Sequence, residues 1–222
     1  MIYIVNQSSV VSEADLAKWI AAINRQLQEH FAPQWSIIPP IVLAMVDYSS
    51  LIGRPLIKLV DEVDVSGALG YHTESGGTVV GQVGAKTCLD NGASISQCLS
   101  HEVLEATKDP FVGGWEDNAA DGTSHAREMC DAVQDGTYQI DGVDVSNFLY
   151  PAYFDSQDTT GPFDYLGALK APFTRTPGGY QMVRLTQPDA TQLGERPPWK
   201  ANAYRVSRRK DAHHTTPRAS ER

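Results

Sequence analysis

Apolar and polar positions alternate along the chain with two different periods, and these periods predict its first elements. Residues 2–5 form a short run of β-branched and aromatic side chains, which predicts a buried strand. Apolar residues then recur at steps of three and four over residues 16–31, which predicts an amphipathic helix that stops before Pro33. Either Ser12 or Ser9 can cap this helix, because a serine side chain accepts hydrogen bonds from first-turn amides.

Four apolar runs separate this helix from the next one. They predict strands at residues 36–47, 56–65, 68–72 and 78–83, the first of them interrupted at Pro39-Pro40. Residues 93–108 contain no Gly or Pro and predict a second helix. Asp109-Pro110 ends it, because the residue before a proline is biased away from the α region. This order of elements predicts an α+β or mixed α/β fold, with a twisted sheet backed by two helices.

The second half of the chain loses this regular pattern. Residues 111–126 are rich in Gly, Asp and Asn and predict a loop, whereas residues 137–140 and 143–148 predict a hairpin around Asp141-Gly142. From residue 187 onward Pro, Gln, Arg and His replace the apolar residues. We therefore predict one domain at residues 1–186 and a basic, Pro- and Arg-rich arm at residues 187–222.

Charge is unevenly distributed along the chain. The formal net charge is −9, and residues 195–222 carry eight Lys/Arg and three Asp/Glu, which gives +5. Residues 1–194 therefore hold ten Lys/Arg and 24 Asp/Glu, which gives −14. An acidic body argues against a core that binds nucleic acid, whereas the basic arm is suited to contact a protein partner or a neighbouring copy of the chain.

Cysteine content and the lengths of the apolar runs indicate in which compartment the protein is expected. Three cysteines are too few for a disulfide framework. The N-terminus lacks the basic start and long apolar stretch of a signal peptide, and no apolar run approaches the roughly 20 residues that span a bilayer. We therefore expect a soluble protein, either cytoplasmic or virion-associated, without a signal peptide or a membrane segment.

Candidate chemistry lies on the second predicted helix. His101 and Glu105 are four residues apart, so a helix places both on one face, with Glu102 about a third of a turn away. This is the layout of the HExxH metallopeptidase helix with Glu in place of the second His, and both side chains are accepted zinc ligands. A catalytic zinc needs a third protein ligand, for which Glu128 or Asp131 is the natural source. The simpler alternative is a solvated helix face.

A wider pattern around this helix resembles a known group. It reads H-E-x-x-E-x-x-x-D-P, then a tryptophan, then E-[I/M]-x-D, and its members here are His101, Glu102, Glu105, Asp109, Pro110, Trp115, Glu128 and Asp131. The pattern resembles the core of a zincin-like group of uncharacterised bacterial and phage proteins, and more loosely the exordium-like cell-wall proteins of plants. The resemblance implies a zincin-like α+β fold, in which a mixed twisted sheet carries a backing helix and an active-site helix.

The resemblance also implies a metal site. By analogy with enzymes whose third ligand is a Glu followed shortly by an Asp, we favour Glu128 as the ligand that completes a Zn²⁺ site with His101 and Glu105. Asp131 would then orient His101 from outside the ligand shell. The additional carboxylate shifts the preference toward harder ions, so calcium and manganese are the alternatives to zinc.

The expected function is that of a zinc-dependent metallopeptidase that hydrolyses peptide bonds. Glu102 would act as general base on the metal-activated water. A peptide or protein substrate would lie along the strand at residues 68–72 or the strand at residues 78–83. Three downstream side chains are candidate donors to the oxyanion: Tyr150, Tyr153 and His125. The alternative is a catalytically inactive zincin-fold protein with a structural or interaction role, such as a virion-associated phage component.

Overall fold

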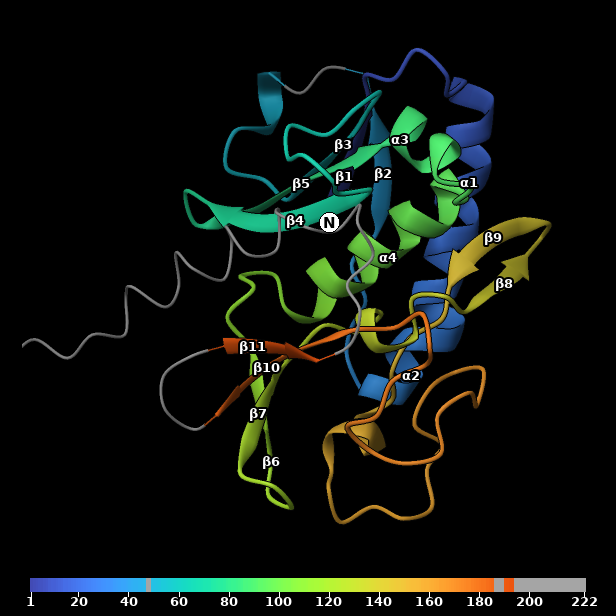
Figure 1. The fold of residues 1–222 in the computed structure, drawn as a ribbon. Coiled ribbons are helices and arrows are strands. Elements are labelled where there is room, and N and C mark those ends of the chain that lie inside the picture. Colours follow the sequence, from blue (N-terminus) through green and yellow to red (C-terminus); the bar gives the residue numbers. More distant parts are fainter. Residues whose placement is uncertain (47–48, 186–189, 194–222) are drawn as a thin grey trace, which may run out of the picture.

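Five strands form the main sheet, in the order β2-β1-β3-β5-β4 (Figure 1). Their bounds are Ile2–Asn6 for β1, Val42–Met45 for β2, Leu56–Val60 for β3, Gly70–Ser75 for β4 and Thr78–Gly84 for β5. All neighbouring pairs run parallel except β4 and β5, so β4 is an antiparallel edge strand. This computed structural model describes residues 1–46, 49–185 and 190–193.

The first helical stretch is longer than its sequence predicts. Helix α1 (Glu13–Arg25) begins after Ser12, whose side chain accepts a hydrogen bond from a first-turn amide at 3.0 Å. A π-helical turn, η1 (Gln26–Phe31), and the short α2 (Ala32–Trp35) continue it. The predicted stop before Pro33 is therefore wrong. Pro33 is tolerated because it lies in the first turn of α2, where its missing N–H is not needed.

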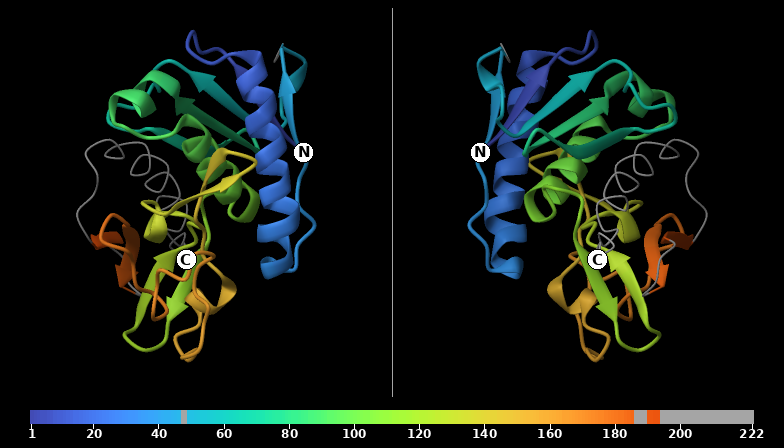
Figure 2. Two further views of the ribbon diagram at one scale, coloured as in Figure 1. Left: turned by 90° about the vertical axis from the view of Figure 1, so that its right-hand side faces the viewer. Right: turned by 90° about the vertical axis from the view of Figure 1, so that its left-hand side faces the viewer.

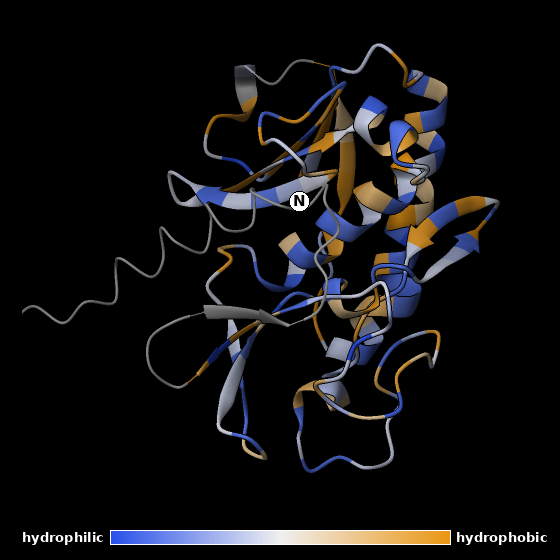
Figure 3. Cartoon of the chain, in the orientation of Figure 1, coloured by the Kyte–Doolittle hydropathy of each residue, from blue (hydrophilic) through white to orange (hydrophobic). Residues whose placement is uncertain are grey.

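Helices α1 and α4 complete the core of the main sheet. Helix α4 (Ile95–Lys108) follows a short helix, α3 (Ala85–Asp90), that the sequence pattern did not predict. Helix α1 packs against β2 and α4 against β4 and β5, and both lie next to the sheet in the two views of Figure 2. Figure 3 shows mostly hydrophobic inner strands and a mostly hydrophilic β4, as expected for an edge strand in contact with solvent.

The chain beyond α4 forms two smaller antiparallel sheets. One has the order β11-β10-β7-β6, and its strands are β6 (Trp115–Asn118), β7 (Thr123–Ala126), β10 (Gln181–Leu185) and β11 (Ala190–Leu193). The other is the hairpin of β8 (Thr137–Ile140) and β9 (Val143–Ser146), which confirms the prediction of a hairpin around Asp141-Gly142. Helix α4 lies between the main sheet and the four-stranded sheet (Figure 1).

The prediction of a loop at residues 111–126 is wrong, because β6 and β7 pair there as a hairpin. Their sequences, WEDN and TSHA, are too polar to give a strand pattern, and β10 supplies part of the pairing from about 60 residues downstream. The predicted mixture of α and β structure is confirmed. Residues 187–189 and 194–222 of the predicted arm lie outside the described residues. Within the described ranges, no helix is both long and apolar enough to cross a membrane.

Candidate metal centre

Helix α4 is buried along most of its length, which is unusual for a helix with this many polar residues. Its apolar residues Leu99 and Val103 are fully buried in the core, as the sequence pattern predicts. A neighbouring side of the helix is held by the β8–β9 hairpin, because the amide of Ser146 donates to Ser100 Oγ at 2.7 Å and Ser96 Oγ donates to the Asp144 carbonyl at 2.8 Å. These bonds fix the rotation of α4 and therefore the direction of its His and Glu side chains.

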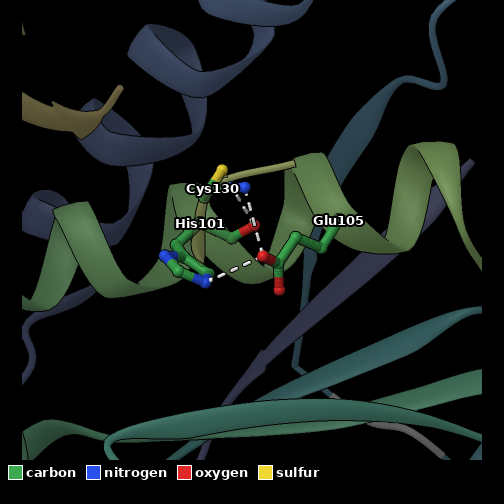
Figure 4. Close-up of side chains that lie close together, drawn as sticks. All are labelled: His101, Glu105 and Cys130. Carbon is green, nitrogen blue, oxygen red and sulfur yellow. Dashed lines mark hydrogen bonds and ion pairs between the residues drawn. The ribbon is translucent and has the colours of Figure 1, made fainter. Parts of the chain in front are cut away.

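His101 and Glu105 point from the same side of α4, as Figure 4 shows. The Nε2 atom of His101 lies 3.1 Å from Glu105 Oε1 and 3.2 Å from Asp131 Oδ1. The amide of Cys130 donates to the same Oε1 atom at 3.2 Å. Two carboxylates therefore converge on one nitrogen of the imidazole, and all three residues have exposed fractions of 5% or less.

The segment that carries Glu128, Cys130 and Asp131 is fixed from both sides. The amide of Leu149 donates to the Met129 carbonyl at 2.8 Å, and the amide of Tyr180 donates to the Asp131 carbonyl at 3.0 Å. Carboxylate oxygens of Glu105, Glu128 and Asp131 all lie within 4.8 Å of one another. Glu128 and Asp131 therefore both lie close to Glu105 of α4, as expected for a third metal ligand.

His72 is a member of this group that the sequence analysis did not name. It lies on β4, two residues after Gly70, so both residues face α4 from the same side of the strand. His72 Nδ1 lies 3.3 Å from Glu102 Oε2 and 4.0 Å from Glu105 Oε2. Its other ring nitrogen, Nε2, lies 3.2 Å from the carbonyl oxygen of Asp109. A lone histidine in a strand gives no signal of its own, because only the tertiary fold brings β4 onto α4.

The loop after α4 completes the support of His72. Asp109 accepts hydrogen bonds from the amides of Gly113 and Gly114 through its carboxylate, at distances between 2.9 and 3.2 Å. These bonds hold the Asp109 carbonyl in place beneath the imidazole. On the strand side, a Cβ atom added at Gly70 would lie 3.1 Å from Cγ and Oε1 of Glu102. Any larger residue at this position would crowd the Glu102 side chain, so glycine favours the close approach of β4 to the helix.

Charge accumulates in this buried space. The carboxylates of Glu102, Glu105, Glu128 and Asp131 have exposed fractions between 2% and 4%. Burial by itself lowers the pKa of His72, but the hydrogen bond to Glu102 and the charges of Glu128, Glu102 and Glu105 outweigh it and raise the pKa to about 9. Buried carboxylates need a cation beside them, because an uncompensated buried charge is strongly destabilising.

The donor atoms fit a divalent metal ion. Two ligands on one tetrahedral zinc, each at about 2.0–2.1 Å, lie about 3.3 Å apart. The distances of 3.1 and 3.2 Å from His101 Nε2 to Glu105 and Asp131 match this spacing. One imidazole with carboxylates is also a donor set that suits manganese, and calcium is favoured less because it prefers oxygen ligands.

The position of Asp131 differs from the role assigned to it by analogy. A residue that orients a metal-bound histidine from outside contacts the ring nitrogen that faces away from the metal. Asp131 instead contacts Nε2, the same nitrogen that faces Glu105. The geometry therefore places Asp131 among the candidate ligands, next to Glu128, rather than behind His101.

A small hollow reaches the centre from the side of the four-stranded sheet. It offers about 10 Å³ to the centre of a water-sized molecule, and its lining includes His125, Glu128, Asp131, Tyr153, Tyr180 and Gln181. Of the three oxyanion donors considered from the sequence, His125 and Tyr153 line this hollow, and Tyr150 is not part of its lining. The hydroxyl of Tyr153 accepts a hydrogen bond from Gln181, which fixes its position.

Comparison of the chain with protein-family models, with curated proteins and with solved structures gives no match in any of the three. The similarity to zincin-like proteins therefore stays a prediction that rests on the residues of α4 and of the segment from Glu128 to Asp131.

Proposed function

We propose that this chain is a zincin-type metallopeptidase with one catalytic ion held by His101, Glu105 and Asp131, and with Glu128 beside them. The observation that carries the proposal is the convergence of two carboxylates on Nε2 of His101 at the spacing of ligands on one ion. Zinc is the first candidate, and manganese and calcium are the alternatives. A zincin-type arrangement is further supported by the antiparallel edge strand β4 beside the helix with the HExxE sequence.

A divalent ion at this position supplies Lewis acidity toward a peptide carbonyl and a lowered pKa for water. The chain supplies the proton acceptor, for which Glu102 is suited because it is the next residue after His101 and its carboxylate lies on the β4 side of the centre. His72 holds that carboxylate at 3.3 Å. The outer edge of β4 offers an extended peptide a strand to pair with, whereas β5 is enclosed between β3 and β4.

A structural role is the second candidate, and the burial of the centre favours it. His72, His101 and the four carboxylates all have exposed fractions of 5% or less. An ion in such a place could serve only to join α4 to the segment from Glu128 to Asp131, as structural metal sites do. In that case the chain would be an inactive structural or interaction protein.

Metal content and hydrolysis of an unstructured protein substrate distinguish these two functions. We expect zinc in protein purified without chelator, and its loss in Asp131→Asn. We expect Glu102→Gln to keep the catalytic ion and to lower hydrolysis by about 10²- to 10⁴-fold, the usual contribution of a general base. Glu62→Gln is the matched control, because Glu62 is exposed and remote from the centre.

Equal hydrolysis by wild type and Glu102→Gln would contradict the role of Glu102 as general base. A wild type that contains the ion but hydrolyses no peptide would favour the structural role. Absence of any ion from wild type, together with no binding on addition of zinc or manganese, would rule out both functions as stated.

A further inference from the structure

The buried side chains around α4 form two groups that share one residue. Glu105 Oε1 lies 3.1 Å from Nε2 of His101, whereas Glu105 Oε2 lies 4.0 Å from Nδ1 of His72. The donor atoms of His72, Glu102 and Glu105 lie within 4.8 Å of one another, as do those of Glu105, Glu128 and Asp131. The two oxygens of Glu105 therefore face different histidines, which is the arrangement expected of a carboxylate that bridges two ions.

The hydrogen bonds of His72 show that a proton or a metal ion lies between this residue and Glu102. A carbonyl oxygen only accepts hydrogen bonds, so His72 Nε2 carries the proton that is donated to Asp109 at 3.2 Å. Nδ1 of a neutral ring then has a lone pair that faces the carboxylates of Glu102 and Glu105. Two acceptors face each other only when a proton or a metal ion lies between them. Donation of the other ring N–H to a backbone carbonyl is also the usual support of a metal-bound histidine.

The distances leave room for an ion at this point. Two atoms bonded to the same ion at about 2.0–2.2 Å can be at most about 4.4 Å apart. His72 Nδ1 lies 3.3 Å from Glu102 Oε2 and 4.0 Å from Glu105 Oε2, both inside this limit. Both carboxylates are therefore close enough to His72 Nδ1 to share an ion with it.

Charge balance supports two ions rather than one. Glu102, Glu105, Glu128 and Asp131 together carry −4 when ionised, and the two imidazoles are neutral when they act as metal ligands. One divalent ion beside a protonated His72, whose pKa is raised to about 9, leaves −1 in a buried space, whereas two divalent ions bring the sum to zero. Complete neutralisation is the arrangement that burial favours.

We propose that His72, Glu102 and Glu105 bind a second divalent cation, joined to the first through Glu105. The inference rests on the proposed function only through the shared Glu105. It adds a regulatory consequence, because Glu102 cannot both ligate an ion and accept a proton from water. Peptide hydrolysis by wild type is therefore expected to rise up to one equivalent of metal and to fall when the second site fills.

Manganese binding to the metal-free full-length chain tests the second site independently of hydrolysis. Equilibrium dialysis against Mn²⁺ is expected to give two ions per chain for wild type and one for His72→Gln. His30→Gln is the matched control, since His30 is half-buried on η1 and contacts Tyr138 instead of the centre, and it is expected to keep two. Should circular dichroism show that His72→Gln is unfolded, Glu102→Gln replaces it, again with one ion expected.

Electron paramagnetic resonance of the same samples adds a spectroscopic test. Ions in two-metal sites lie about 3.5–4 Å apart, so two Mn²⁺ ions joined by Glu105 interact and lose the six-line signal of an isolated ion. We expect that loss in wild type with two equivalents of Mn²⁺ and recovery of six lines in His72→Gln.

The outcomes separate the second site from the proposed function. One ion in both wild type and His72→Gln, with six lines in each, would overturn the second site and leave the first intact. One ion in wild type and none in His72→Gln would overturn the two-ion inference. It would also show that the single ion binds at His72 and not at the position proposed for catalysis. No ion in wild type would overturn both.

Discussion

At the scale of single residues, Glu105 determines what the centre can bind. A histidine in its place would offer one donor atom to one ion, whereas a carboxylate offers two oxygens and adds a negative charge. Here one oxygen faces His101 and accepts from the Cys130 amide, and the other faces His72. Replacement of the second His of an HExxH sequence by Glu therefore enlarges the donor set of the helix.

Gly70 is the residue that sets the distance between β4 and Glu102. We predict that Gly70→Ala displaces the Glu102 carboxylate by a few tenths of an ångström, because the new Cβ would lie 3.1 Å from its Cγ and Oε1 and 3.2 Å from the Gln82 carbonyl. Overpacking of this kind costs about 1–3 kcal/mol of unfolding free energy. Hydrolysis should fall about tenfold or more, since small errors in the position of a catalytic group are costly.

Urea denaturation and hydrolysis assays on Gly70→Ala check this prediction. Gly113→Ala is the matched control, because a Cβ there would have its nearest contact at 3.7 Å, an ordinary van der Waals distance. The control should match wild type in both measurements. Unchanged stability and unchanged hydrolysis in Gly70→Ala would show that β4 has freedom to move away from α4.

The residues of the centre could be predicted only where they share a local pattern. His101, Glu102 and Glu105 follow from helical spacing, and Glu128 and Asp131 from their place in a wider motif. His72 could not be found in this way, because it is 29 residues before His101 and belongs to a strand whose register decides which side chains face α4. The contact of Asp131 with Nε2 is likewise a product of tertiary packing.

At the scale of elements, β2 shows how an exposed sheet edge is protected by a side chain. Asn24 of α1 donates through Nδ2 to the Val42 carbonyl at 2.9 Å, and its Oδ1 accepts from the Val42 amide at 2.9 Å. The side-chain amide thus satisfies the outer edge of β2 as a neighbouring strand would. Val42 itself is fully buried, so water cannot easily take the place of Asn24.

We predict that Asn24→Ala lowers the free energy of unfolding by about 1–3 kcal/mol, since it leaves a buried donor and a buried acceptor without their partner. The free energy of unfolding of Asn24→Asp should lie between those of Asn24→Ala and wild type. A carboxylate still accepts a hydrogen bond from the Val42 amide but cannot donate one to the Val42 carbonyl. Asn91→Ala is the control, as Asn91 is exposed and bonds only to the end of α3, and its effect should stay within about 0.5 kcal/mol. Equal midpoints in urea for all three variants would contradict the role given to Asn24.

Elements whose sequences have a strong apolar periodicity were predicted from the sequence. Elements that form mainly because another part of the chain packs or pairs with them were not. Local sequence signals, either periodic apolar residues or turn residues, mark the strand β1, the helices α1 and α4 and the hairpin β8–β9. The strands β6 and β7 are polar, and they pair because β10 lies beside β7. Helix α2 passes a proline because a π-helical turn precedes it, and neither feature has a periodic signal.

At the scale of the whole molecule, the centre lies where the main core joins α4 to the segment with Met129 and Cys130. Its six side chains come from β4, α4 and the segment that leads from the four-stranded sheet to the β8–β9 hairpin. The ionised carboxylates repel one another there, and a protonated His72 offsets only part of this charge, so metal-free protein carries an electrostatic strain at its centre. Metal binding should therefore be coupled to the stability of the entire fold.

We predict that unfolding free energy rises with free metal concentration, and that the slope counts the ions released on unfolding. Above the dissociation constant, each tenfold increase in free ion adds about 1.4 kcal/mol for one bound ion and about 2.7 kcal/mol for two. Urea midpoints measured in zinc buffers are expected to give the larger slope for wild type and the smaller one for His72→Gln. A chelator should bring wild type to its lowest midpoint. A midpoint that does not change between chelator and saturating zinc would mean that the buried carboxylates hold protons instead of metal, and the centre would then be an acid cluster with no role in metal binding.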